Sequence, residues 1–158
     1  MVVIAKTPLA YRQDGKYRFE LKEPFRVNVP ALAGRTGSRQ WIDFSVNVPG
    51  AVGEGSLNTW LWLHADGTLE IEDGYAWDGC SPAWKLAGKW WGTPTPEDTR
   101  MACLMHDALY QFLDRGMWTR AEADSIFFEL MKQQGFRLAP IYYGAVRIFG
   151  GIHHAIFR

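Results

Sequence analysis

The residues of this sequence best suited to chemistry are a neighbouring histidine and carboxylate, His106 and Asp107. Histidine gains and loses a proton near neutrality, which makes it a common general base. On a helix, Cys103, His106, Asp107 and Tyr110 lie at i, i+3, i+4 and i+7 and share one face. Adjacent helical residues diverge by roughly 100°, so Asp107 is expected to bind a cation rather than to orient His106. The alternative is a half-exposed polar face without chemistry.

The carboxylate that could orient His106 is predicted on the following helix, at Asp124. Asp124 falls inside the apolar stripe of that helix, where a carboxylate is costly unless it is paired. If the two helices pack antiparallel, Asp124 can accept a hydrogen bond from His106 and fix its tautomer. The candidate catalytic set is therefore His106, Asp124 and Tyr110. The alternative is a structural Asp124 that bonds a backbone amide or a tyrosine hydroxyl.

A third candidate is the turn that precedes these helices, which contains Asp78, Gly79, Cys80 and Ser81. Turns of this composition can present backbone amides to an oxyanion or carbonyls to a cation. Gly79, Cys80 and Ser81 are thus loop or oxyanion candidates, and Asp78 joins Asp107 as a candidate metal ligand. Oxygen ligands favour calcium or magnesium over zinc. The alternative is a turn that merely leaves a strand.

The elements that must position these residues divide near Trp91 into β and α parts. Strands are predicted over residues 16–22, 41–48, 59–64 and 68–72, with an Asp66-Gly67 hairpin turn between the last two. Loops are predicted over residues 30–40 and 49–56. One domain spans residues 1–158, with 1–91 mainly β and loops and 92–158 mainly α. The fold class is α+β, a small antiparallel sheet or hairpin half followed by a three-helix half.

The helix boundaries follow from capping residues. The first helix is predicted from an N-cap at Thr95, with Pro96 at its first position, to about residue 113. The second begins with a capping box formed by Thr119 and Glu122 and ends at Gly135. The third covers residues 140–149, and its continuation past residues 150–151 stays open.

Composition narrows the classes of function. Seventeen basic residues balance seventeen acidic ones, so no electrostatic footprint for nucleic acid is present. No apolar run approaches the roughly 20 residues of a membrane span. The two cysteines, Cys80 and Cys103, lack zinc-site spacing, and reduced thiols are the expectation for a protein made in the cytoplasm.

The order of several motifs resembles a phage and prophage family of unknown function catalogued as number 1353. The residues that carry this resemblance are Trp77-Asp78-Gly79-Cys80-Ser81-Pro82, Met105-His106-Asp107-Ala108-Leu109-Tyr110, Ala123-Asp124 with Phe127, and Tyr143-Gly144-Ala145-Val146-Arg147-Ile148-Phe149-Gly150. Cys80 departs from the alanine expected in the first motif. The resemblance implies a tailed-phage or prophage origin and supplies no activity.

A second resemblance is local. The segment Ala102-Cys103-Leu104-Met105-His106-Asp107-Ala108-Leu109-Tyr110 is similar to the catalytic helix of phospholipases of the A-two type. That resemblance implies His106 as general base, Asp107 as a calcium ligand and Asp124 as the orienting carboxylate. It also implies that the loop at residues 77–81 supplies calcium carbonyls and that Cys103 and Cys80 occupy the places of a disulfide. The glycine-dense calcium loop of those enzymes is absent here.

Two functions stay open. The first is a phage-encoded protein, associated with the virion, tail or lysis, that hydrolyses an ester or amide of the host envelope, either lipid or peptidoglycan, with calcium as its implied ion. The second is a non-catalytic phage structural or accessory protein in which the His-Asp-Asp set is a buried network. Both expect other phage proteins as partners, synthesis in the host cytoplasm and the virion as a further location.

Overall fold

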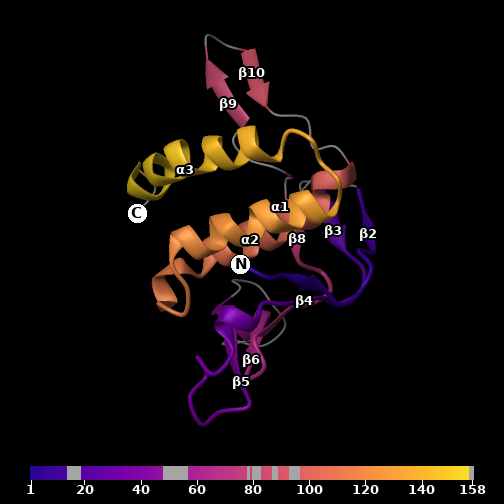
Figure 1. The fold of residues 1–158 in the computed structure, drawn as a ribbon, viewed down its shortest axis with the longest axis vertical. Helices are drawn as coiled ribbons and strands as arrows, with labels where there is room; N and C mark the ends of the chain where they lie inside the picture. The colour runs from indigo at the N-terminus through magenta and orange to yellow at the C-terminus, as the bar shows by residue number, and fades with distance from the viewer. Residues whose placement is uncertain are drawn as a thin grey trace. The chain divides into compact units, whose positions relative to one another are not determined.

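A computed structural model describes residues 1–13, 19–47, 57–77, 79, 83–86, 89–92 and 97–156 of the chain. The chain forms two compact units, Met1–Trp77 and Asp78–Arg158. The first contains the main antiparallel sheets and the second contains three α-helices, which confirms the predicted α+β class (Figure 1). The boundary between the units precedes the composition change near Trp91.

The larger sheet of the first unit has five antiparallel strands in the order β1-β4-β7-β6-β5. In that order the strands are Ile4–Ala5, Phe25–Asn28, Thr68–Ile71, Leu57–His64 and Trp41–Asn47. A smaller sheet pairs β2 (Tyr11–Arg12), β3 (Phe19–Leu21) and β8 (Ala76–Trp77). A single 3-10 turn, η1 (Pro30–Leu32), lies inside the predicted loop over residues 30–40. The predicted loop over residues 49–56 lies outside the described residues.

Alternation along the strands gives the five-stranded sheet two different faces, because successive side chains point to opposite sides. One face is buried and apolar, and it carries Phe25, Val27, Phe44, Leu61, Leu63, Leu69 and Ile71. The other, which we name the outer face, carries Arg26, Trp41, Asp43, Trp62, His64 and Glu70. The register supports this division, since Asp43 pairs with Trp62, Trp62 with Glu70 and Arg26 with Glu70.

The predicted hairpin between β6 and β7 is confirmed, with Leu63 opposite Leu69. Gly67 closes its turn with φ of 83°, a left-handed conformation that favours glycine. A Cβ atom at Gly67 would also overlap the backbone carbonyl of Val29. The amide of Val29 donates to the carbonyl of Gly67 at 3.0 Å, so this turn is packed against the segment after β4.

Substitution of Gly67 tests this close approach. We expect Gly67→Ala to lower the free energy of unfolding by about 2 kcal/mol more than Gly37→Ala does, because only the first adds overpacking. Gly37 is a matched control, since its φ is 64° and no atom lies within 4 Å of the place that a Cβ atom would take there. Urea denaturation followed by circular dichroism measures both. Equal losses would show that the turn at Gly67 is not constrained by Val29.

The second unit begins with a hairpin of β9 (Ala83–Leu86) and β10 (Lys89–Gly92). Its helical part consists of η2 (Glu97–Thr99), α1 (Arg100–Gln111), η3 (Leu113–Arg115), α2 (Arg120–Gln133) and α3 (Ala139–Ile156). Helix α2 contacts both α1 and α3 (Figure 1). Within the described part of the chain, no helix is long and apolar enough to cross a membrane.

The predicted helix ends are partly confirmed. The capping box of Thr119 and Glu122 is present at the start of α2, and Gly135 follows its end with φ of 75°. Helix α3 does continue past residues 150–151. The predicted start of the first helix is wrong, because α1 begins at Arg100 with its N-cap at Thr99, and Glu97–Thr99 form a 3-10 turn. Thr95 and Pro96 lie outside the described residues.

Candidate functional site

Helices α1 and α2 bring His106 and Asp124 together. His106 Nε2 lies 3.0 Å from Asp124 Oδ1, which confirms the predicted pairing. The side chain of Asp124 has no exposed surface, and His106 is 9% exposed. The half-exposed polar face considered as an alternative is therefore wrong at His106, because packing against α2 covers the face of α1 opposite its apolar stripe.

Tyr110 and two arginines complete the surroundings of Asp124. The Tyr110 hydroxyl donates to Asp124 Oδ1 at 2.6 Å, and Arg147 Nη1 donates to Oδ2 at 3.0 Å. Arg120 Nε lies 3.7 Å from Asp124 Oδ2 and donates to the Tyr110 oxygen at 3.2 Å. Each carboxylate oxygen thus accepts a charged or polar donor, as a buried carboxylate requires.

The two arginines also tie α3 to this network. Arg120 Nη2 donates to the backbone carbonyl of Val146 at 3.0 Å and to that of Arg147. Neither arginine was expected from the sequence. Arg120 had a local signal, since it stands four residues before Asp124 on the same helix. Arg147 had no such local signal, because it lies on a different helix, 23 residues from Asp124 along the chain.

The contacts of Asp124 fix its ionisation. Burial raises the pKa of Asp124, but hydrogen bonds from His106, Tyr110 and Arg147 together outweigh burial and hold that pKa below its ordinary value. Burial, together with the hydrogen bond to the Asp124 carboxylate, raises the pKa of the Tyr110 hydroxyl, so Tyr110 stays protonated and donates.

An ionised Asp124 in turn determines the tautomer of His106. A carboxylate only accepts hydrogen bonds, so Nε2 carries the proton in this contact. In the neutral imidazole, Nδ1 then holds the lone pair that accepts a proton. Among the described residues, Nδ1 has no hydrogen-bond partner. The imidazole ring packs against Tyr110 and Phe127, with centroid distances of 4.1 and 4.7 Å, so its orientation is held on both the polar and the apolar side.

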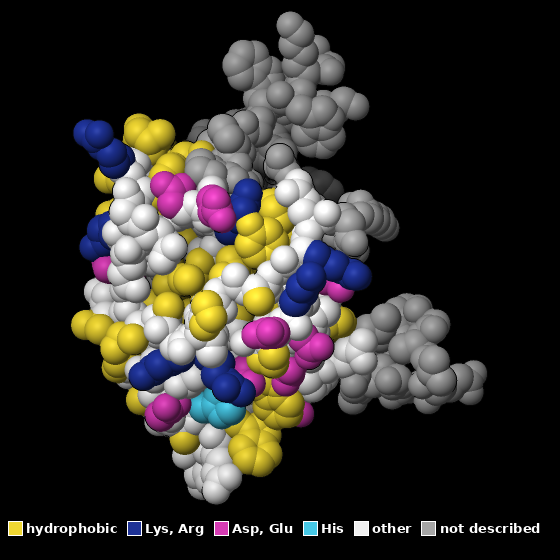
Figure 2. Space-filling model, turned by 90° about the vertical axis from the view of Figure 1, so that its right-hand side faces the viewer, with side chains coloured by type: hydrophobic (Ala, Val, Ile, Leu, Met, Phe, Trp, Pro, Cys, Tyr) yellow, Lys and Arg dark blue, Asp and Glu magenta, His cyan; other side chains and the backbone are white. Residues whose placement is uncertain are grey.

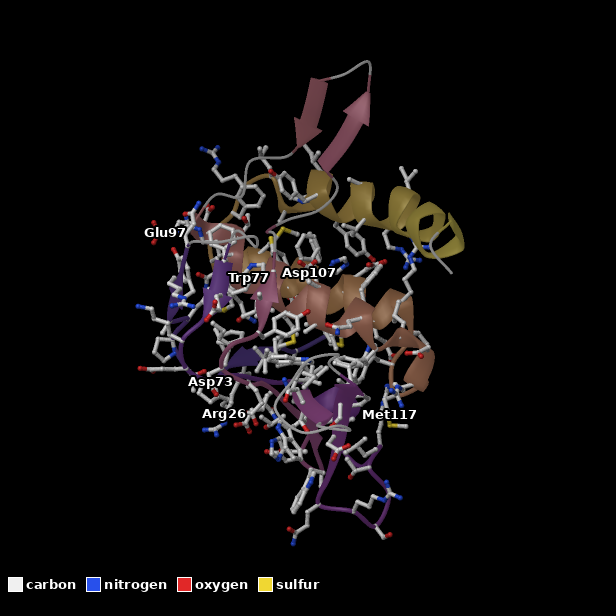
Figure 3. The ribbon with its side chains drawn as sticks, turned by 180° about the vertical axis from the view of Figure 1, so that it is seen from behind. Arg26, Asp73, Trp77, Glu97, Asp107 and Met117 are labelled. Carbon is white, nitrogen blue, oxygen red and sulfur yellow. The ribbon has the colours of Figure 1, made fainter. Side chains whose placement is uncertain are left out.

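The predicted metal and oxyanion residues are not assembled within the described structure. Asp107 lies on α1, half-buried, beside His106 in sequence (Figure 3). Gly79 is buried with φ of 95°, whereas Asp78, Cys80 and Ser81 lie outside the described residues. No group of three or more His, Cys, Asp or Glu side chains in the described part of the chain could hold a metal ion. Because Asp78 and most of the loop lie outside the described residues, the calcium site that the sequence suggested stays a prediction.

Cys103, three residues before His106 on α1, is disulfide-bonded. The expectation of a reduced thiol at this position is therefore wrong. The sequence has one other cysteine, Cys80, which lies outside the described residues. A covalent tie on α1 limits movement of the helix that carries His106.

Thiol counting tests the disulfide. We expect the denatured, unreduced protein to show no reactive thiol with a chromogenic disulfide reagent and the reduced protein to show two. A disulfide that restrains the unfolded chain contributes about 2–4 kcal/mol, so Cys103→Ser should lower the free energy of unfolding by that amount. The same protein under reducing conditions is the control, where the substitution should matter far less. Two reactive thiols in the unreduced sample would contradict the disulfide.

Fold and site together define an α+β protein whose helical unit contains a buried histidine–carboxylate–tyrosine network. The family model described as a protein of unknown function (DUF1353) matches residues 59–146, more than half of the chain. The chain belongs to this family. The matched range contains His106, Tyr110 and Asp124, while Arg147 follows it directly. No curated protein and no solved structure matches the chain.

The pH dependence of stability tests the state of Asp124. Its pKa is lower in the folded protein than the ordinary value of 3.8, so its contribution is present above that value and is lost as pH falls through the lower, folded pKa. We expect Asp124→Asn to lower the free energy of unfolding at pH 7 by on the order of 3 kcal/mol. The difference from wild type should shrink below about pH 4.

Asp114→Asn is the control for that measurement, because Asp114 is an exposed aspartate outside the network. The free energy of unfolding of the Asp114→Asn variant should stay within about 0.5 kcal/mol of the wild-type value at both pH 3 and pH 7. A difference for Asp124→Asn that is equally large at pH 3 and pH 7 would contradict an ionised Asp124.

Proposed function

We propose that the protein is a hydrolase in which His106 is the general base for a water molecule. One observation supports this assignment: the 3.0 Å contact between His106 Nε2 and a fully buried Asp124 carboxylate. This contact orients the imidazole and leaves Nδ1 as its basic nitrogen. The arrangement is that of a base and its orienting acid, as water activation requires.

The reaction on an ester can be written with this chain's own groups. Water bound to His106 Nδ1 gives up a proton to that nitrogen as its oxygen attacks the ester carbonyl carbon. Asp124 stabilises the imidazolium that forms, and Tyr110 and Arg147 keep Asp124 ionised. Collapse of the tetrahedral intermediate breaks the bond to the alcohol oxygen, which takes the proton back from Nδ1. The products are a carboxylic acid and an alcohol, and the imidazole is neutral again.

The substrate class follows from the likeness of α1 to the phospholipase helix, which suggests an ester of a lipid. We further propose that the protein is encoded by a phage or prophage, with the host envelope as the source of the ester and other phage proteins as partners in the virion or at lysis. The steps above use only this chain's own groups, and calcium held by Asp107, Asp78 and loop carbonyls stays part of the proposal.

A non-catalytic role is the second candidate, and a specific observation favours it. Asp124 has no exposed surface and joins side chains from α1, α2 and α3. Such a network stabilises a helical unit whether or not water reaches His106. The catalytic role predicts that the protein hydrolyses an ester, and the structural role predicts that it does not. Measurements of activity therefore distinguish the two roles.

The decisive experiment measures ester hydrolysis by wild type and variants. We expect the protein to release p-nitrophenol from p-nitrophenyl butyrate or fatty acid from phosphatidylglycerol vesicles, assayed with and without calcium at about 1 mM. His106→Ala should lower kcat at least about 100-fold, because a general base contributes about 10²–10⁴-fold. Asp124→Asn should also lower kcat.

His64→Ala is the matched control, because His64 also pairs with a carboxylate but lies in the first unit. It should retain wild-type turnover. Wild-type protein that hydrolyses neither substrate, or a folded His106→Ala variant with wild-type kcat, would exclude the proposed hydrolase and leave the structural role.

A further inference from the structure

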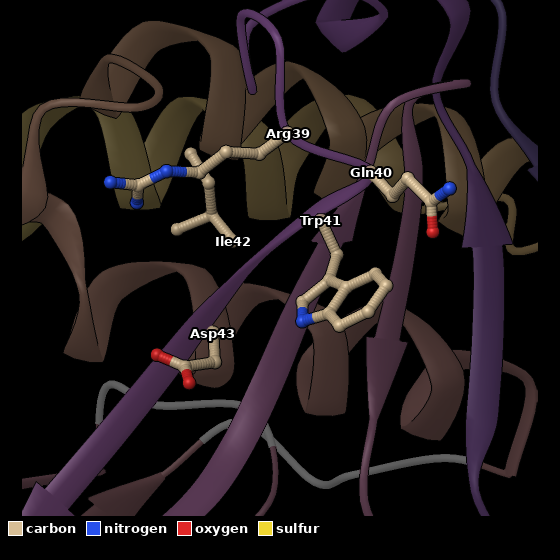
Figure 4. A pocket seen from close by; sticks show the side chains of 5 residues that line it. All are labelled: Arg39, Gln40, Trp41, Ile42 and Asp43. Carbon is tan, nitrogen blue, oxygen red and sulfur yellow. The ribbon is translucent and has the colours of Figure 1, made fainter.

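Two hollows adjoin each other, one around the edge strand β5 and one on the outer face of the five-stranded sheet. The first is lined by Arg39, Gln40, Trp41, Ile42 and Asp43, and Figure 4 shows the indole of Trp41 beside the Gln40 amide and the Asp43 carboxylate. The second is lined by Arg26, Gln40, His64, Ala65, Asp66, Thr68 and Glu70. Gln40 borders both hollows, and we name the two together the Trp41 strip.

An ordered aromatic surface forms one part of the Trp41 strip. Trp41 is 48% exposed, high for so large an apolar side chain. Its ring meets that of Trp62 edge to face, with a centroid distance of 6.2 Å and an interplanar angle of 70°. The Trp62 indole N–H donates to Glu72 Oε1 at 2.5 Å, so the supporting ring is held in place. The Trp41 indole thus packs against a hydrogen-bonded ring while about half of its surface stays exposed.

Fixed polar groups form the other part. Glu70 is only 9% exposed, and its two oxygens accept from Arg26 Nη2 at 2.6 Å and contact His64 Nε2 at 2.9 Å. The hydrogen bond from Arg26 lowers the pKa of Glu70 more than burial raises it, so Glu70 is ionised and His64 Nε2 carries a proton. Among the described residues, His64 Nδ1 has no partner, and Arg26 remains half-exposed.

The charges of the strip nearly cancel. Arg26 and Arg39 face Asp43, Asp66 and Glu70, and Arg26 and Glu70 are paired with each other. Both oxygens of Asp66 accept from Thr68, one from its amide and one from its hydroxyl. Figure 2 shows the same intermixing of acidic and basic side chains over one face of the molecule. A balanced surface of this kind favours an uncharged ligand over a polyanion or a cation.

We propose that the Trp41 strip binds a neutral saccharide. A pyranose ring has an apolar C–H face that stacks on an indole and a rim of hydroxyls that both donate and accept. The strip offers the matching pair of surfaces. An exposed indole lies beside amide and carboxylate groups and beside an imidazole and a guanidinium that Glu70 holds. Sites for small ligands combine aromatic surface with a few fixed polar groups in this way.

This assignment involves the first unit alone, and it holds or fails independently of the hydrolase proposed for the second. The experiment titrates the full chain with maltotetraose, cellotetraose, chitotetraose and mannotetraose, by calorimetry and by the indole N–H signals of two-dimensional NMR. We expect saturable binding of at least one tetrasaccharide. Trp41→Ala should weaken that binding by at least about tenfold, and Gln40→Ala should weaken it less.

Two matched variants complete the design. Ile141→Ala removes a side chain that is 67% exposed in the second unit, and His106→Ala removes the proposed base; both should bind the saccharide as wild type does. Absence of saturable binding to all four tetrasaccharides would overturn the proposal. So would binding that Trp41→Ala leaves unchanged, or Trp41-dependent binding of dextran sulfate or a proline-rich peptide in place of the neutral sugars.

Discussion

A carboxylate without exposed surface is the constraint on which the helical unit depends. Removing Asp124 from water costs several kcal/mol unless donors replace its hydration. The fold supplies them from three helices: His106 and Tyr110 from α1, Arg120 from α2 itself and Arg147 from α3. Because these donors meet at one carboxylate, the hydrogen bonds that hold the three helices together also orient the imidazole. The geometry that suits a general base follows from satisfying this buried charge.

A second carboxylate paired with a histidine and an arginine occurs in the first unit, at Glu70, where the surrounding groups stay partly exposed. Glu70 also stands between a histidine and an arginine, but it lies on an open sheet face rather than between helices. Its partners are consequently part-exposed, so the groups around it remain accessible to a ligand. The two clusters therefore differ in their degree of burial. The cluster at Asp124 encloses a single imidazole, whereas the cluster at Glu70 presents several polar groups beside an exposed indole.

Local signals predicted a large part of the fold. The Asp66-Gly67 hairpin, the capping box at Thr119 and the end of α2 at Gly135 all depend on residues close together in sequence, and all are confirmed. The start of α1 was wrong, since the residues expected in its first turn form a 3-10 turn, which competes with the α-helix at such ends. Asp124 was also found from sequence, because a charge on an apolar stripe demands a partner.

What the sequence by itself determined is therefore local: the three helices, part of the sheet around the hairpin of β6 and β7, and the need for a partner at Asp124. It did not predict the short strands β1, β2 and β8, the strand β4 inside the five-stranded sheet, or the hairpin of β9 and β10. Tertiary structure alone decided the arginine partners of Asp124, which the sequence did not predict. Arg147 reaches Asp124 from a helix with no sequence relation to it, and the Trp41 strip joins strands separated along the chain. Periodicity and capping report on neighbours within a few residues, whereas these contacts arise when distant segments bury surface against one another.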